Sequence, residues 1–411
     1  MNPPSRATPD LLFVDAAIAT PFRWVRGHLR VEGSRIAALA AGDPAPASID
    51  AGTRVFDLGG ARLAPGFIDT HVHGGGGADV MDATPEAIAR VAATHAAGGT
   101  TSFMPTTVAA PLEAIEAVLD AHRAFVARPP SGARSLGVHL EGPYLAPSQA
   151  GALDRRFMRV PEGDAGLLLL TPEAGVRRMT AAPELPGGMA LGQRLRSLGA
   201  IAAIGHSGVR GDGLLEALEH GYTLLTHFYS GMEGVTREHA YRVAGLVEGG
   251  YLHDHLWVEL IADGSHLPIE LLRLIRKVKG ADRIVLTTDA MRAAGLGPGT
   301  YALGGAEDGR SVIVEDGVAK LPDRSAFAGS VSLAVDLLRT MTEGAGLDLL
   351  DALRMVTVNP ARMLGLDHRI GRLAVGMDAD LVVLGDGLQV RGTLAGGRWV
   401  HGEGAMHAER G

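Results

Sequence analysis

Two histidines separated by one residue follow a short apolar run in this 411-residue chain. The run Phe67–Thr70 is typical of a buried strand, and His71 and His73 come directly after it. Side chains two positions apart on an extended chain point to the same face, so both imidazoles could bind one ion. The glycines at 74–77 leave space for backbone or ligand beside the rings. Two unrelated polar residues at a strand end would give the same pattern, so other parts of the chain must decide.

Residues with metal-binding or acid–base side chains also follow five later apolar runs. They are Glu141 in HLEGPYL, His206 in IGHSG, His227 in LTHFYSG, Asp263 and His266 in ADGSH, and Asp289 in LTTDAM. A single polar residue after a strand usually caps a helix or bonds to loop backbone. Capping does not readily explain such residues at six strand ends.

The apolar runs that precede these residues alternate with helical patterns. Eight strands are predicted, at 67–70, 101–106, 136–140, 176–180, 201–204, 222–226, 257–261 and 284–288. Helical patterns include 85–97, 111–126, 213–220 and 268–279, and 167–170 is also assigned to a helix. This alternation predicts an α/β fold, specifically a (β/α)8 TIM-like barrel. The carboxyl ends of barrel strands form one rim, where active sites are built, so the reactive residues should meet there.

Both ends of the chain have a β-rich pattern that differs from the barrel. We expect residues 1–60 and 367–411 to form one small β-sandwich-like domain, and residues 61–366 to form the barrel. Within the barrel, residues 301–321 look like an inserted hairpin with the turn signal Asp316-Gly317. Helices are predicted at about 331–344 and 348–357.

Composition excludes several classes of protein. The net charge of −8 does not favour nucleic acid or an anionic membrane. There is no cysteine, so disulfides and thiolate metal sites are excluded. Apolar residues make up 46% and charged residues 20%, as in ordinary globular proteins. No signal peptide and no apolar run long enough to span a bilayer are found. We therefore expect a cytoplasmic protein without a membrane or nucleic-acid partner.

The candidate ligands indicate the chemistry. Four imidazoles and two carboxylates without thiolate suit Zn²⁺ or another divalent first-row ion, and one or two ions could be held. Such a metal lowers the pKa of its bound water towards about 7 and so supplies hydroxide at neutral pH. A carboxylate must then carry the proton to the leaving group, and Asp289 is assigned this role. Hydrolysis of an amide or related C–N bond is the expected reaction class.

Several motifs together resemble a known family. PGFIDTHVHGGGG, HLEGPYLAP, IGHSG, THFYSGM, ADGSHL, TTDAM, FAGS and the closing NPARMLGL and GRLAVGMDADLVVL are similar to the amidohydrolase superfamily. More narrowly, they resemble the N-acetylglucosamine-6-phosphate deacetylase family, from about residue 60 to 400. The combination of LEGPY, GHS, DGSH and TDAM is specific, whereas HxH and GxxADLVV fit most amidohydrolases.

The resemblance implies removal of acetate from N-acetyl-D-glucosamine 6-phosphate, which leaves D-glucosamine 6-phosphate. It implies that Glu141, His206 and His227 are metal ligands and that Asp289 also stands at the metal as catalytic proton carrier. His71 and His73 match a pair that supports a second metal in some members. The other matched positions bind substrate in the family: Ala152, Ser230, Gly231, Arg237, His266, Ala328 and Gly329. Because Arg237 matches an arginine that reaches the neighbouring subunit's sugar phosphate, a homodimer is implied.

Three departures from the family concern the substrate pockets. Ser230-Gly231 replaces the usual Asn-Ala, His239-Ala240 replaces a common Pro-Gly, and Leu153 stands where many members have a polar residue near the acetyl group. The epimer of the amino sugar is therefore open. Another acyl substrate also stays open: N-acetylgalactosamine 6-phosphate, an N-acyl amino acid or a cyclic amide. A non-catalytic barrel used as a scaffold is less favoured, because such a chain should have lost ligands.

Overall fold

Eight parallel strands form a nearly closed barrel at the centre of the chain. The computed structural model describes residues 10–45, 52–129, 131–306 and 309–406. In spatial order the barrel strands are β6 (Phe67–Val72), β9 (Thr100–Thr107), β11 (Val138–Glu141), β12 (Val176–Ala181), β13 (Ile201–Ile204), β14 (Tyr222–Leu225), β17 (Trp257–Leu260) and β18 (Ile284–Leu286). A bridge between Val72 and Ala290 joins the segment after β18 to β6. The predicted (β/α)8 fold is confirmed.

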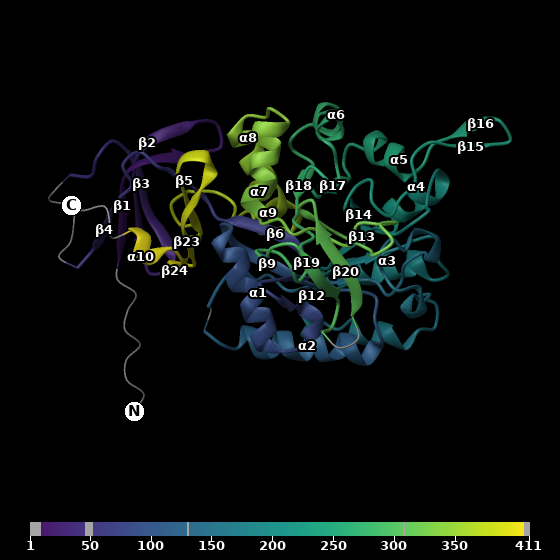
Figure 1. Cartoon of the computed structure of the whole chain (residues 1–411). Coiled ribbons are helices and arrows are strands. Elements are labelled where there is room, and N and C mark those ends of the chain that lie inside the picture. Colours follow the sequence, from purple (N-terminus) through teal and green to yellow (C-terminus); the bar gives the residue numbers. More distant parts are fainter. Residues whose placement is uncertain (1–9, 46–51, 130, 307–308, 407–411) are drawn as a thin grey trace.

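Helices surround the barrel strands (Figure 1). They are α1 (Pro85–Ala97), α2 (Leu112–Val126), α3 (Gly188–Ser197), α4 (Asp212–Glu219), α5 (Leu246–Leu252), α6 (Ile269–Lys279), α7 (Ala334–Arg339), α8 (Leu349–Val356) and α9 (Val358–Met363), with a short α10 (Glu403–Met406) near the end of the chain. Local sequence explains the start of α1, because the Thr84 side chain accepts the amide hydrogen of Ala87 and Pro85 occupies the first turn. No helix in the described part of the chain is long and apolar enough to cross a membrane.

A mixed sheet contains strands from both ends of the chain, which lie side by side in Figure 1. Its order is β24 (Arg398–His401), β23 (Val390–Ala395), β22 (Leu381–Leu384), β5 (Arg62–Pro65), β1 (Leu11–Ala19), β2 (Trp24–Glu32) and β3 (Arg35–Ala41), and β4 (Arg54–Asp57) pairs with β1. The rings of Phe13, Phe56 and Trp399 pack together in its core, with centroids 5.3–5.9 Å apart. The predicted β unit built from both chain ends is therefore present.

The predicted division at residues 60 and 367 stays a prediction. β5 hydrogen-bonds with β22 of the mixed sheet, although its residues were assigned to the barrel. Residues 1–9 and 407–411, which the prediction also included, lie outside the described residues.

Short β-strands are inserted between the elements of the barrel. The predicted insertion is a three-stranded sheet of β19 (Gly299–Leu303), β20 (Arg310–Glu315) and β21 (Val318–Lys320). Asp316 and Gly317 both have positive φ in the β20–β21 turn, as a tight hairpin requires. A second hairpin, β15 (Thr236–Glu238) and β16 (Tyr241–Val243), projects from the barrel end of the molecule (Figure 1). The remaining short strands are β7 (Gly74–Gly75), β8 (Ala78–Asp79) and β10 (Arg134–Ser135).

Candidate active site

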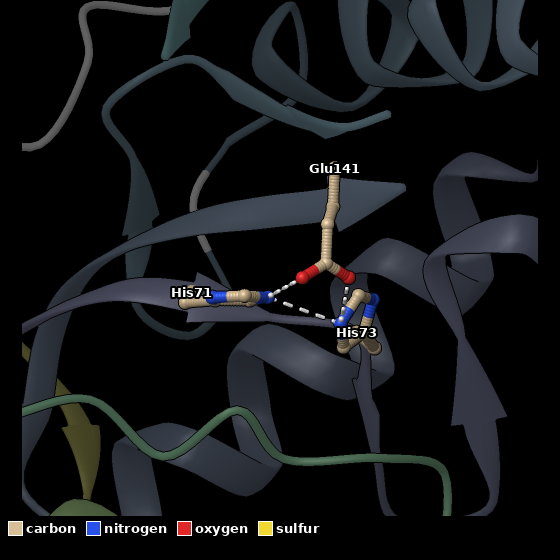
Figure 2. A group of neighbouring side chains, drawn as sticks. All are labelled: His71, His73 and Glu141. Atoms are coloured by element: carbon tan, nitrogen blue, oxygen red, sulfur yellow. Dashed lines mark hydrogen bonds and ion pairs between the residues drawn. The ribbon is translucent and has the colours of Figure 1, made fainter. Parts of the chain in front are cut away.

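The first ligand group joins the strands β6 and β11. His71 lies within β6, His73 follows that strand directly, and Glu141 is the last residue of β11. Figure 2 shows the three side chains pointing toward one another. The Nε2 atoms of the two imidazoles are 3.1 Å apart, and Nε2 of His73 is 3.3 Å from Oε2 of Glu141. All three residues are buried, and their facing atoms could hold one metal ion.

The second ligand group shares Glu141. Its Oε1 atom lies 3.3 Å from Nε2 of His206 and 3.0 Å from Nε2 of His227. The two Nε2 atoms are 3.1 Å apart. Since this group could also hold an ion, Glu141 stands between two adjacent candidate positions.

Asp289 lies beside the first group. Its Oδ1 atom is 3.1 Å from Nε2 of His73 and 3.3 Å from Nε2 of His71. Burial raises the pKa of Asp289, but the two imidazoles outweigh this effect and lower it below the usual value. The side chain is therefore a carboxylate at neutral pH, which is the form that a proton acceptor needs.

Three of these residues have a strained backbone. His206, His227 and Asp289 have φ values of 47°, 31° and 47°, a region that side chains other than glycine rarely adopt. Each turns the chain sharply just after a barrel strand. The Nδ1 atoms of the two histidines bond to the carbonyl oxygens of Gln149 at 2.7 Å and Ser230 at 3.1 Å. Backbone strain of this kind persists where the surrounding structure enforces it, and it clusters at functional sites.

The electrostatics of the site fit a cation. Burial lowers the pKa of His71, but the carboxylates of Asp289 and Glu141 outweigh burial and raise it to about 9. Burial favours neutral Glu141, yet His71 and the hydrogen bonds from His206 and His227 keep its pKa well below its usual range. Without a metal, protons on His71 and His73, whose pKa values the carboxylates raise, balance the negative charge. A divalent cation would supply the same positive charge, so the residues present fit one.

A cavity of about 170 Å³ opens beside these ligands. Its lining includes most of the residues predicted to contact substrate, namely Ala152, Ser230, Gly231, His266, Ala328 and Gly329. His266 is oriented by Asp263, whose Oδ2 atom is 2.8 Å from its Nδ1 atom. Arg237 does not line this cavity; it lies on the exposed hairpin strand β15. The described site therefore brings together all of the predicted residues except that arginine.

A sequence model of the amidohydrolase family matches residues 62–400. This range contains the barrel, the ligands and the last strands of the mixed sheet. The chain belongs to the amidohydrolase family.

Relatives within the amidohydrolase family cover nearly the whole chain. An N-acetylgalactosamine-6-phosphate deacetylase of Escherichia coli O157:H7 is 36% identical over 383 residues, covering 92% of this chain and 95% of the relative. An N-acetylglucosamine-6-phosphate deacetylase of Bos taurus is 36% identical over 354 residues, which is 84% of each chain. A solved variant of a Mycobacterium smegmatis N-acetyl-D-glucosamine-6-phosphate deacetylase, in complex with N-acetyl-D-glucosamine-6-phosphate, has a TM-score of 0.84 and 33% identity, covering 95% of this chain and 99% of its own. The resemblance predicted from the motifs is confirmed.

Sequence reasoning missed part of this amidohydrolase site. Val108 and Leu303 line the cavity with apolar side chains, and the buried pair Arg178 and Glu259 lies beside the ligand His71. The available signal for the last two was a charged residue within a predicted strand, Arg178 in VRRMTA and Glu259 in WVEL, because a charged side chain must find a partner when buried.

Proposed function

We propose that this chain is a metal-dependent deacetylase of N-acetylated amino-sugar 6-phosphates. The preferred reaction converts N-acetyl-D-glucosamine 6-phosphate to D-glucosamine 6-phosphate and acetate. The single observation that carries the proposal is the meeting of two histidine–glutamate groups and Asp289 at one cavity. The full-length similarity to enzymes named as deacetylases of such substrates supports it.

A divalent metal, which we propose to be Zn²⁺, would be held by His71, His73, Glu141, His206 and His227, with Asp289 adjacent. Histidine nitrogen and carboxylate oxygen without sulfur suit this ion. When bound, such an ion polarises an amide carbonyl and activates water at neutral pH. One or two ions per chain are compatible with two groups that share Glu141.

Asp289 is the proposed proton carrier. Its carboxylate faces the ligands at one side of the cavity and is ionised at neutral pH. From this position it takes a proton from the attacking water and gives it to the amine nitrogen that leaves. The buried setting keeps bulk water from competing for that proton.

The phosphate is proposed to bind at a subunit interface. His266 lies in the cavity of its own chain, whereas Arg237 is exposed on the projecting hairpin together with His239 and Arg242. A guanidinium fork matches phosphate oxygens. We propose that the hairpin reaches the cavity of a second copy, which makes the enzyme a homodimer.

A second candidate substrate is the galactose epimer. A relative named N-acetylgalactosamine-6-phosphate deacetylase is 36% identical over 92% of this chain. N-acetyl-D-galactosamine 6-phosphate should therefore be tested alongside the glucose epimer. N-acyl amino acids and cyclic amides have no such support. The proposed location is the cytoplasm, where phosphorylated sugars are held.

The test is a substrate panel on the purified, metal-loaded protein. Acetate and free amine are measured with the two N-acetyl hexosamine 6-phosphates, the two unphosphorylated sugars, an N-acetyl amino acid and a cyclic amide. We expect kcat/KM for one phosphorylated sugar to exceed that of its unphosphorylated form by at least about 100-fold, because a site built to hydrogen-bond a substrate group rejects the analogue that lacks it. Faster turnover of the amino acid or the cyclic amide would contradict the proposed function.

A further inference from the structure

A buried ion pair lies inside the barrel near the metal-binding residues. Arg178 on β12 and Glu259 on β17 are both fully buried. The guanidinium donates to both carboxylate oxygens, from Nη1 to Oε1 at 2.6 Å and from Nη2 to Oε2. Removal of two charges from water is unfavourable, and a buried pair is weak evidence for stability. The role of this ion pair must therefore be sought in its contacts with neighbouring residues.

The pair hydrogen-bonds to residues that directly precede metal ligands in the chain. Nη1 of Arg178 donates to the carbonyl oxygen of Thr70 at 3.1 Å, and Nη2 donates to the hydroxyl of Thr226 at 3.0 Å. The hydroxyl of Thr70 donates to Oε1 of Glu259 at 3.2 Å. Thr70 is the residue before His71, so the pair holds the backbone directly beside that ligand.

Glu259 also approaches the ring of a ligand directly. Its Oε2 atom lies 3.6 Å from Nδ1 of His71, and this buried Nδ1 has no hydrogen-bond partner among the described residues. The opposite nitrogen, Nε2, faces His73 and Glu141. The group on the far nitrogen of a metal-binding histidine fixes which nitrogen is free to bind, and it fixes the orientation of the ring.

The second ligand group is oriented by other means. His206 and His227 place their Nδ1 atoms against the backbone carbonyl oxygens of Gln149 and Ser230. Within the described structure, neither ring makes a polar contact with Glu259. A loss of the Glu259 carboxylate should therefore affect the two groups differently.

We propose that Glu259, held in place by Arg178, is a positioning residue for His71. It directs Nε2 of that ring at a divalent cation in the group formed by His71, His73 and Glu141. The group formed by Glu141, His206 and His227 does not depend on it. The inference rests on the metal dependence within the proposed function, but it concerns cation binding and needs no substrate.

The experiment measures Zn²⁺ binding to chelator-treated protein by calorimetry and metal content per chain by mass spectrometry. His71→Ala and His206→Ala identify the ions of the two groups. We expect Glu259→Gln to reproduce the effect of His71→Ala, with about 10–100-fold weaker binding at the first group. Binding of the ion that His206→Ala removes should stay within about threefold of wild type.

Two further variants separate positioning from a general loss of stability. Glu259→Gln leaves the buried charge of Arg178 uncompensated and could prevent folding. The pair Arg178→Met with Glu259→Leu removes both charges, so the folded double variant gives the decisive measurement. Asp380→Asn is the matched control, because Asp380 is a buried carboxylate that pairs with Arg134 away from the ligands. It should lower the melting temperature without changing metal content.

Two results would overturn the proposal. One is a folded Glu259→Gln or double variant that binds both ions with wild-type affinity. The other is a His71→Ala protein with the metal content and affinity of wild type, which would mean that the first group holds no ion of its own. Because the measurement uses Zn²⁺ alone, a protein inactive on every sugar would contradict the proposed function without affecting this result.

Discussion

At the scale of single residues, the proposed role of Asp289 requires an ionised carboxylate. It is ionised, buried and 3.1 Å from the Nε2 atom of His73. Asparagine keeps the size of the side chain but cannot accept a proton. We expect Asp289→Asn to fold, to retain metal and to lower turnover by about 10²–10⁴-fold. Acetate release and metal content check this together, and near-normal turnover would reject the assigned role.

Gly231 is a second residue whose substitution should affect the site. Its φ is 60°, and a Cβ atom there would lie 2.9 Å from Nδ1 of His206. Alanine at residue 231 would therefore strain the backbone and displace the ring of His206, a candidate metal ligand. We expect Gly231→Ala to weaken Zn²⁺ binding by about 10–100-fold, as changes beside metal ligands do.

The control for this substitution is Gly208→Ala, two residues after His206 in the chain. A Cβ atom at residue 208 would meet only an oxygen of Glu184, at 3.8 Å, and the backbone there has no positive φ. Metal affinity should therefore match wild type. If Gly231→Ala also matches wild type, the chain relaxes around residue 231 without moving the ring.

At the scale of elements, the hairpin β15–β16 projects from the barrel, and its Arg237 does not line the cavity of its own chain (Figure 1). His239 and Ala240 form its turn with φ values of 45° and 74°, and Arg237 pairs with Arg242 across the strands. Such adjacent exposed positive charges repel each other unless an anion lies between them. This arrangement supports a phosphate site in a second copy.

Arg237→Ala should therefore raise KM for the 6-phosphorylated sugar by at least about tenfold and leave KM for the plain sugar nearly unchanged. Mixed with Asp289→Asn subunits, it should regain activity, because some sites then contain both intact residues. The exposed Arg123 on α2 serves as the control, and Arg123→Ala should behave as wild type. Equal losses on both sugars would mean that Arg237 only supports the fold.

The elements also show which structural features could be predicted from the sequence. The end of β13 at Ile204 could be predicted, because the apolar run stops there. The strand β18 ends at Leu286, two residues before the predicted end, and the hydroxyls of Thr287 and Thr288 donate to Asp69 instead. The hairpin β15–β16 could not be predicted, since His239-Ala240 contains none of the usual turn residues. Arg178 and Glu259 are 81 residues apart on strands that are not neighbours in the barrel, and only the closed barrel brings them together.

At the scale of the whole molecule, the metal should contribute to folding stability. The ligands come from β6, β11 and the segments after β13 and β14, so one ion links distant parts of the barrel. A ligand that binds the folded chain alone stabilises it by about 2.7 kcal/mol at 100 times its Kd. A melting temperature that rises with Zn²⁺ concentration and falls with a chelator is therefore expected.

The pH dependence of this stabilisation follows from His71. Its pKa in the folded, metal-free chain is raised to about 9, against an ordinary value of 6.5. The stability from the protonated ring is thus fully present below pH 6.5 and is lost as the pH rises through about 9. Protons compete with the metal over the same range, so metal binding strengthens as the pH rises.

We therefore expect the difference in melting temperature between Zn²⁺-loaded and chelator-treated protein to widen from pH 6.5 to pH 9. Taking the difference cancels groups outside the site, such as Lys279, whose pKa burial lowers to about 8 in both forms. Calorimetric scans at pH 6.5, 7.5, 8.5 and 9 would measure it. In His71→Ala the widening should be smaller, because one proton-binding ring is gone. A difference that stays constant or narrows would mean that the buried carboxylates are not balanced by protons on these imidazoles, and the charge argument for a cation at this rim would fail with it.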